Sequence, residues 1–128
     1  MSKETKKDIE ENKKQDEKSQ ILEGAAKEYY SSGEDELKKE RYNSSVVLFF
    51  KALVAFVDLY IYQKTGKTPS SHKERFRVAQ NNFAEVYNLL DKDFPFYQDS
   101  YIQTMSRELA EVIEDDAKTM AEKVGVKL

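Results

Sequence analysis

The stretch SSVVLFFKALVAFVDLYIYQK, residues 44–64, decides the fold of this chain. As a helix it is apolar nearly all round, because Lys51 and Asp58 are its only charged residues before Lys64. A helix of this kind lies at the centre of a bundle or is buried by a second subunit. Lys51 and Asp58 stand seven residues apart and share one face, which we interpret as the solvent-facing seam. The alternative is that they pair with charges on other elements.

Helical patterns continue on both sides of this stretch. The composition, with 35% charged residues, four Gly and two Pro, favours helix, and no segment alternates long enough to predict a strand. Apolar residues at helical spacing predict helices over about 20–40, 44–64, 72–94 and 95–123. Gly66 and Pro69 predict a loop at 65–71, and Ser71 with Glu74 reads as a capping box. Short links predict an all-α, up-and-down antiparallel four-helix bundle over residues 20–128.

The first 19 residues are predicted to be a charged leader, either a frayed helix or disordered. Residues 1–20 hold as many lysines as acidic residues, and Ile9 is the only large aliphatic residue after Met1. A segment without an apolar face has nothing to bury. A fifth helix, formed by an N-terminal extension, is compatible with the predicted four-helix bundle. Within the first long helix, Gly33 predicts either a close helix crossing or a local break.

Composition also excludes several kinds of site. The chain has no Cys and one His, which excludes disulfides, thiolate metal sites and a Glu-x-x-His di-iron centre. We therefore expect no metal and no cofactor. The net charge of −3 gives no global basic field for nucleic acid. The charged N-terminus and the two charges within 46–61 argue against a signal peptide and a membrane span, so we expect a cytoplasmic protein.

One basic region stands out, at residues 64–77. Five cations and one acid, Glu74, give it a local charge of +4 (5 − 1), and His72 begins the helix that follows. A helix N-terminus offers free amides and partial positive charge to a phosphate or carboxylate. The tentative anion-binding residues are Lys67, Ser71, His72, Lys73, Arg75 and Arg77. The alternative is a solvated loop in which Arg75 bonds an acidic neighbour and His72 lies near the cap.

An aromatic corner follows at residues 94–101. Its rings predict base stacking, core packing or a dimer contact. We expect a homodimer, because the helix over 44–64 carries more apolar surface than three neighbours of this size are expected to cover. The tentative interface residues are Phe49, Phe56, Tyr97 and Tyr101.

Four segments taken together resemble HEPN-domain proteins. They are RYNSS (41–45), FFKAL (49–53) with Asp58, TGKTPSSHKERF (65–76), and the aromatic pattern of Phe94, Pro95, Tyr97 and Tyr101. Their order is similar to that in small prokaryotic, especially archaeal, HEPN-like proteins, over roughly residues 20–110. The resemblance implies a bundle of four or five helices, often dimeric. It implies either a metal-independent ribonuclease with an Arg-x4–6-His motif, or a binding partner of nucleotides, RNA or small nucleotidyltransferases.

The nuclease motif of that family is missing here. The only histidine is His72, and positions 65–67, where the arginine would stand, read Thr65, Gly66 and Lys67. Lys67 lacks the fixed fork of an arginine. We therefore predict a non-catalytic HEPN-like binding module that engages a nucleotide, RNA or a nucleotidyltransferase through residues 64–77. The alternatives are a ribonuclease that uses His72 with Lys67, Arg75 or Arg77, and a purely structural dimerising partner.

Overall fold

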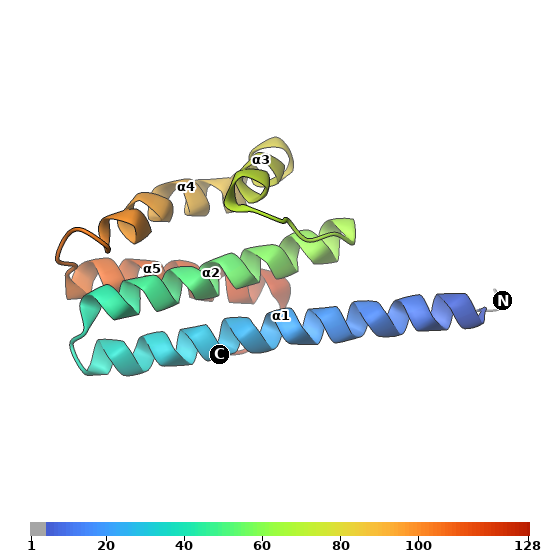
Figure 1. Ribbon diagram of the computed structural model, residues 1–128, viewed down its shortest axis with the longest axis horizontal. Coiled ribbons are helices and arrows are strands. Elements are labelled where there is room, and N and C mark those ends of the chain that lie inside the picture. Colours follow the sequence, from blue (N-terminus) through green and yellow to red (C-terminus); the bar gives the residue numbers. More distant parts are fainter. Residues whose placement is uncertain (1–4) are drawn as a thin grey trace.

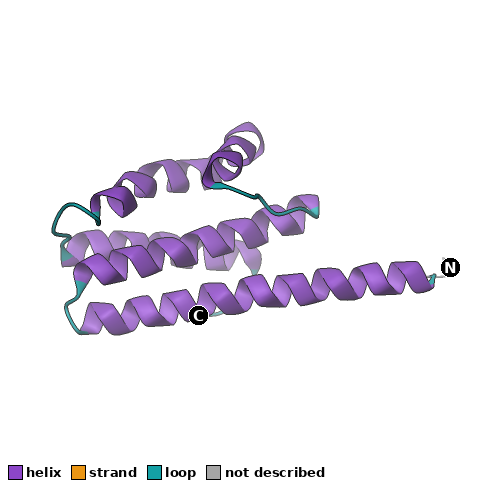
Figure 2. Cartoon of the chain, in the orientation of Figure 1, coloured by secondary structure: helices purple, strands orange, loops and turns teal. Residues whose placement is uncertain are grey.

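The computed structural model describes residues 5–128, and helices make up most of this part of the chain (Figure 1; Figure 2). No strand occurs among these residues, so the prediction of an all-helical protein is confirmed. The helices are α1 (Lys6–Lys38), α2 (Tyr42–Thr65), α3 (His72–Asn82), α4 (Ala84–Asp99) and α5 (Arg107–Val124).

Helix α2 is the centre of the fold. It packs most extensively against α1 and α5, and α4 covers part of its remaining surface. Figure 1 shows α1 and α4 on opposite sides of α2, with α5 behind it. Phe49, Phe50 and Phe56 are almost wholly buried. The apolar pattern of this helix is therefore satisfied mainly within one protomer.

The length and apolar composition of α2 also meet the minimum for a membrane span, contrary to the expectation from sequence. In the fold, 56% of its most apolar window is buried against the other helices. The core helix of a soluble protein has the same composition, so this property alone does not indicate a membrane.

Helix α1 begins much earlier than Gln20, where the sequence analysis placed its start. Thr5 caps it: the Thr5 hydroxyl accepts from the Asp8 amide at 3.1 Å, and the Asp8 carboxylate accepts from the Thr5 amide at 3.2 Å. Residues 5–14 are exposed, and this part of α1 extends beyond the end of α2 (Figure 1). The predicted leader is thus helical from Lys6, and its residues 1–4 lie outside the described part.

The second half of the chain divides differently from the prediction. Phe83 has extended φ of −138° and separates α3 from α4, whereas one helix was expected there. Pro95, expected to start the last helix, lies inside α4. Phe94 and Tyr97 both pack on Phe50, with ring centroids at 5.9 and 4.6 Å. This packing holds the helix together across the proline and overrides its local preference.

Asn43 fixes the connection between α4 and α5. Its amide nitrogen donates to the carbonyls of Ser100 and Gln103 at 2.8 and 2.7 Å, and its oxygen accepts from the Met105 amide at 3.0 Å. Asparagine is a residue type that often caps helices, but no side chain caps α2. The side-chain amide of Asn43 instead forms hydrogen bonds with the backbone of residues 100–105. This fixes the connection after which α5 begins at Arg107.

Gly33 marks the close crossing of α1 and α2, and α1 is not broken there. A Cβ added at Gly33 would lie 2.7 Å from two ring carbons of Phe49. Phe49 is fully buried, so its ring has little freedom to move aside. The crossing interpretation of Gly33 therefore holds.

We predict that Gly33→Ala destabilises the protein by about 1–3 kcal/mol, because the new methyl group forces Phe49 out of position. The matched control is Gly24→Ala on the same helix, where nothing lies within 4 Å of the added Cβ. That change should be neutral or stabilise by up to about 1 kcal/mol through helix propensity. Urea unfolding followed by circular dichroism measures both. Equal effects of the two substitutions would contradict the close crossing.

Candidate functional site

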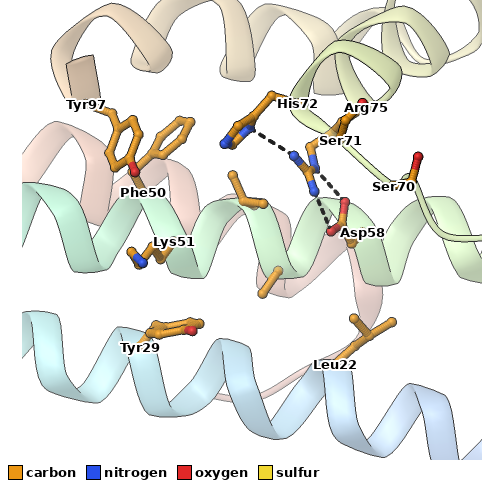
Figure 3. Close-up of a pocket in the computed structure, with 12 residues that line it drawn as sticks. Leu22, Tyr29, Phe50, Lys51, Asp58, Ser70, Ser71, His72, Arg75 and Tyr97 are labelled. Carbon is orange, nitrogen blue, oxygen red and sulfur yellow. Dashed lines mark hydrogen bonds and ion pairs between the residues drawn. The ribbon is translucent and has the colours of Figure 1, made fainter.

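A cleft of about 460 Å³ lies over α2, between α1 and the start of α3 (Figure 3). We call it the α2 cleft. Helix α2 forms its floor, α1 one wall, and the start of α3 with Tyr97 of α4 the other. The lining residues are Leu22, Tyr29, Phe50, Lys51, Val54, Ala55, Asp58, Ser70, Ser71, His72, Arg75 and Tyr97.

A buried ion pair joins α3 to α2 at one end of this cleft. Arg75 Nε donates to Asp58 Oδ1 at 2.7 Å, and Arg75 Nη2 donates to Asp58 Oδ2 at 2.9 Å. The two side chains are only 9% and 14% exposed. A bidentate arginine–carboxylate pair is both directional and strong. Asp58 therefore pairs with another element, as the alternative interpretation proposed, and does not simply face solvent.

The same guanidinium orients His72. Arg75 Nη1 lies 3.0 Å from His72 Nδ1, and an arginine can only donate, so Nδ1 accepts and the proton of the neutral ring is on Nε2. Burial and the charge of Arg75 lower the pKa of His72, while Asp58 raises it in part. The imidazole is thus neutral at pH 7, and the cleft wall carries a fixed ring and not a mobile cation.

Two serines shape the backbone at the start of α3. The Ser71 hydroxyl accepts from the Glu74 amide at 3.1 Å, as the capping box predicted. The Glu74 carboxylate, however, accepts from the amide and hydroxyl of Ser70, at 3.2 and 2.5 Å, and not from the Ser71 amide. These bonds lower the pKa of Glu74. The cap leaves the first amides of α3, at His72 and Lys73, without a partner inside the helix.

Aromatic rings and one lysine complete the cleft. The Lys51 ammonium lies 5.8 Å from the centre of the Tyr29 ring. Tyr97 is stacked on Phe50 with an interplanar angle of 22°. Figure 3 shows Lys51 and Tyr29 on one side of the cleft and His72, Phe50 and Tyr97 on the other. The site thus combines a cation, hydrogen-bond donors and flat apolar surfaces.

The structure gathers only part of the predicted basic site at this cleft. Ser71, His72 and Arg75 line it, whereas Lys67, Lys73 and Arg77 do not. These three cations are exposed. Lys73 and Arg77 instead border a second hollow, on the other side of His72, with Phe76, Gln80 and Phe94.

The four predicted interface residues fall into two groups, one buried in the core and one at the end of α4. Phe49 and Phe56 are fully buried inside the protomer, so a second subunit could not reach them, and this part of the prediction is corrected. Tyr97 and Tyr101 lie at the end of α4, with their hydroxyls 3.0 Å apart. Tyr101 is 68% exposed and its neighbour Ile102 is 79% exposed.

Sequence reasoning missed several residues of the cleft. Leu22 and Tyr29 fit the apolar pattern that predicts the helix over 20–40, and Lys51 was interpreted as part of a solvent-facing seam or as a charge with a partner on another element. One signal was present: Lys51 and Asp58 interrupt the apolar surface of α2 on a single face. That face is the floor of the cleft.

No protein-family model, curated protein or solved structure gave a significant match to this chain. The resemblance to HEPN proteins therefore stays a prediction that depends on the quoted segments. In the described part of the chain, no group of His, Asp and Glu residues is arranged to hold a metal ion.

We predict that Asp58→Ala and Arg75→Ala each destabilise the protein by about 3 kcal/mol, because each leaves a buried charge without its partner. The double substitution should cost less than the sum, with a coupling energy of about 1–3 kcal/mol. Urea unfolding of the four proteins measures this cycle.

The matched control is the exposed pair of Lys27 and Glu23 on α1, which are 3.6 Å apart. Its cycle should give less than about 1 kcal/mol of coupling. Additive effects at Asp58 and Arg75 would show that the bidentate pair does not link α2 to α3.

Proposed function

We propose that this chain is a non-catalytic binding module and that the α2 cleft binds a nucleotide. The observation that supports this is the combination of Lys51, of Ser71 and His72 at the start of α3, and of the rings of Tyr29 and Tyr97 around one cleft. A nucleotide needs both halves of this combination, a site for phosphate and a flat apolar surface for the base.

The phosphate would lie near the start of α3. The helix N-terminus favours an anion there, and the Lys51 ammonium supplies a full charge from the floor. Arg75 contributes less to the anion, because Asp58 already accepts two of its hydrogen bonds. In this proposal Arg75 positions α3 and His72, and Lys51 is the main cation.

The base would lie between the two sides of the cleft, with Tyr29 on one side and Tyr97 on the other. Tyr29 and Tyr97 are both partly exposed and can contact a planar ring. The neutral His72 ring offers a donor at Nε2, since Nδ1 is occupied by Arg75. A fixed donor can select among bases, because a base without a matching acceptor leaves it unpaired.

The ribonuclease alternative needs a cation that is free to stabilise the charge on a scissile phosphate. Arg75 is held by Asp58 and His72, and Lys67 does not line the cleft. The geometry therefore favours binding without cleavage. RNA cleavage that is present in the wild type and absent in His72→Ala would support the alternative instead.

The finer points of fold and assembly are proposals as well. We propose the up-and-down HEPN-like four-helix arrangement, with α3 and α4 together in the third position. The alternating courses of α1, α2, α4 and α5 support it (Figure 1). A homodimer would use the exposed Tyr101 and Ile102 and not Phe49 or Phe56. Binding to RNA or a small nucleotidyltransferase, and a cytoplasmic location, also remain proposals.

We predict that ATP or GTP raises the melting temperature at low salt. A ligand at 100 times its Kd stabilises by roughly 2.7 kcal/mol, which is about 5–15 °C for a domain of this size. Thermal denaturation with ATP, GTP, AMP, a short RNA and inorganic phosphate measures the effect. The shift should shrink in 0.5 M salt, where the Debye length is below about 8 Å.

Lys51→Glu should abolish this shift, because it reverses the charge on the cleft floor. Lys27→Glu is the matched control, since Lys27 is an exposed lysine of α1 outside the cleft. A loss of the shift in both variants, or in neither, would contradict binding in the α2 cleft. A shift with RNA alone would favour the RNA-binding alternative.

A further inference from the structure

Helix α4 carries a buried acidic residue for which the proposed function has no use. Asp93 is 0% exposed, and no group among the described residues donates a hydrogen bond to either oxygen of its carboxylate. An ionised carboxylate in such a place is very costly unless donors surround it. Burial without a hydrogen-bond donor therefore favours the protonated form of Asp93.

The group that can accept this proton is Asp116, on α5. Asp116 is 8% exposed, and Lys92 Nζ lies 2.8 Å from its Oδ2. This ammonium lies against Asp116 and not against Asp93, so Asp93 is the acid of the pair that has no cation bonded to it. Burial, and then the hydrogen bond with Asp116 and its charge, raise the pKa of Asp93 to about 8.

Few other charges act at this point of the fold. The charged groups that act on Asp93 are Asp116 and Lys92, among the residues that the structure describes. Helix α2 also packs on α4, but its charges Lys51 and Asp58 line the α2 cleft. Helix α3 contributes Arg75, which is paired with Asp58, Glu74, which is bonded to Ser70, and the exposed Lys73 and Arg77.

The position of Asp93 connects this pair to the cleft. The next residue, Phe94, lies against His72 with ring centroids 5.6 Å apart, and Tyr97 lines the cleft one turn later. The two ends of α4 are held by other contacts. Glu85 pairs with Lys123 of α5 at one end, and Asn43 binds the Ser100 carbonyl at the other. The acid pair thus lies between these two anchored ends, in the middle of α4.

We propose that Asp93 and Asp116 form a proton-dependent latch, in which one shared proton holds the middle of α4 against α5. When the proton leaves, two carboxylates face each other, and α4 moves away together with the cleft wall that it carries. The proposal concerns the fold of the apo protein and does not depend on nucleotide binding.

The sign of the pH dependence follows from linkage. The closed form binds the proton with a pKa of about 8, and the opened form releases it near the ordinary aspartic acid pKa of 3.8. Opening therefore becomes more favourable by about tenfold for each pH unit between these values, and levels off above the higher one. The latch is tightest in mild acid and loosest in alkaline solution.

Amide hydrogen exchange at pH 6 and pH 8 tests the latch, with rates corrected for the intrinsic effect of pH. In the wild type, protection at Leu89 and Leu90, in the middle of α4, should fall by at least tenfold, up to about 100-fold over two pH units, while protection in the centre of α2 stays unchanged. In Asp93→Asn the side chain cannot ionise and still donates to Asp116, so protection of α4 should change by less than about twofold. Asp91→Asn, an exposed neighbour on α4, is the matched control and should behave as the wild type.

An equal fall in α2 and α4 would mean that Asp93 ionises only on global unfolding, which overturns a local latch. The same fall in Asp93→Asn as in the wild type would also overturn it. If Asp93→Asn does not fold, a carbon-13 titration of the wild-type carboxyl groups decides instead. A midpoint for Asp93 near 8 supports the latch, and a midpoint near 4 contradicts it.

Discussion

The burial of α2 is the constraint on which the rest of this structure depends. A helix that is apolar nearly all round must be covered on nearly every side, and the chain achieves this with α1, α4 and α5. Gly33 permits α1 to approach as closely as the ring of Phe49. Phe50 stacks with Tyr97 and contacts Phe94, which keeps α4 helical through Pro95. At Pro95, the burial of α2 therefore outweighs the local conformational preference against helix.

The candidate site arises where this coverage ends. Lys51 and Asp58 lie on the one strip of α2 that no helix covers fully, and the start of α3 reaches that strip through Arg75. A single guanidinium then performs two tasks, because it anchors α3 on Asp58 and holds Nδ1 of His72. The result is a wall fixed by hydrogen bonds, with Lys51 and Tyr29 on the other side of the cleft.

Much of the architecture follows from sequence, because it depends on local signals. The composition of residues 46–61 places that helix at the centre, Gly66 ends it in a left-handed conformation, and Ser71 caps the next one. The sequence allowed two interpretations of the basic loop, an anion site or a solvated loop in which Arg75 bonds an acidic residue. Its pairing with Asp58 could not be predicted, because the two residues are 17 positions apart in the sequence.

What could not be predicted depends on contacts between distant segments. Asn43 looks like a cap in sequence but binds a loop 57 to 62 residues away. Asp93 reads as one more charge in a polar stretch, and only the packing of α4 on α5 shows that it is buried next to Asp116. Phe49 and Phe56 read as dimer contacts because the sequence does not show how completely α1 and α5 cover them.

We propose that the α2 cleft is a ligand site. Chemical-shift mapping of backbone amides and of the single histidine ring, during titration with ATP at low salt, tests it most directly. We expect saturable shifts confined to residues 22–29, 50–58 and 70–75, to Tyr97 and its neighbours on α4, and to the His72 ring, with α5 unaffected. An absence of shifts, or shifts concentrated on α5 and the C-terminus, would contradict it.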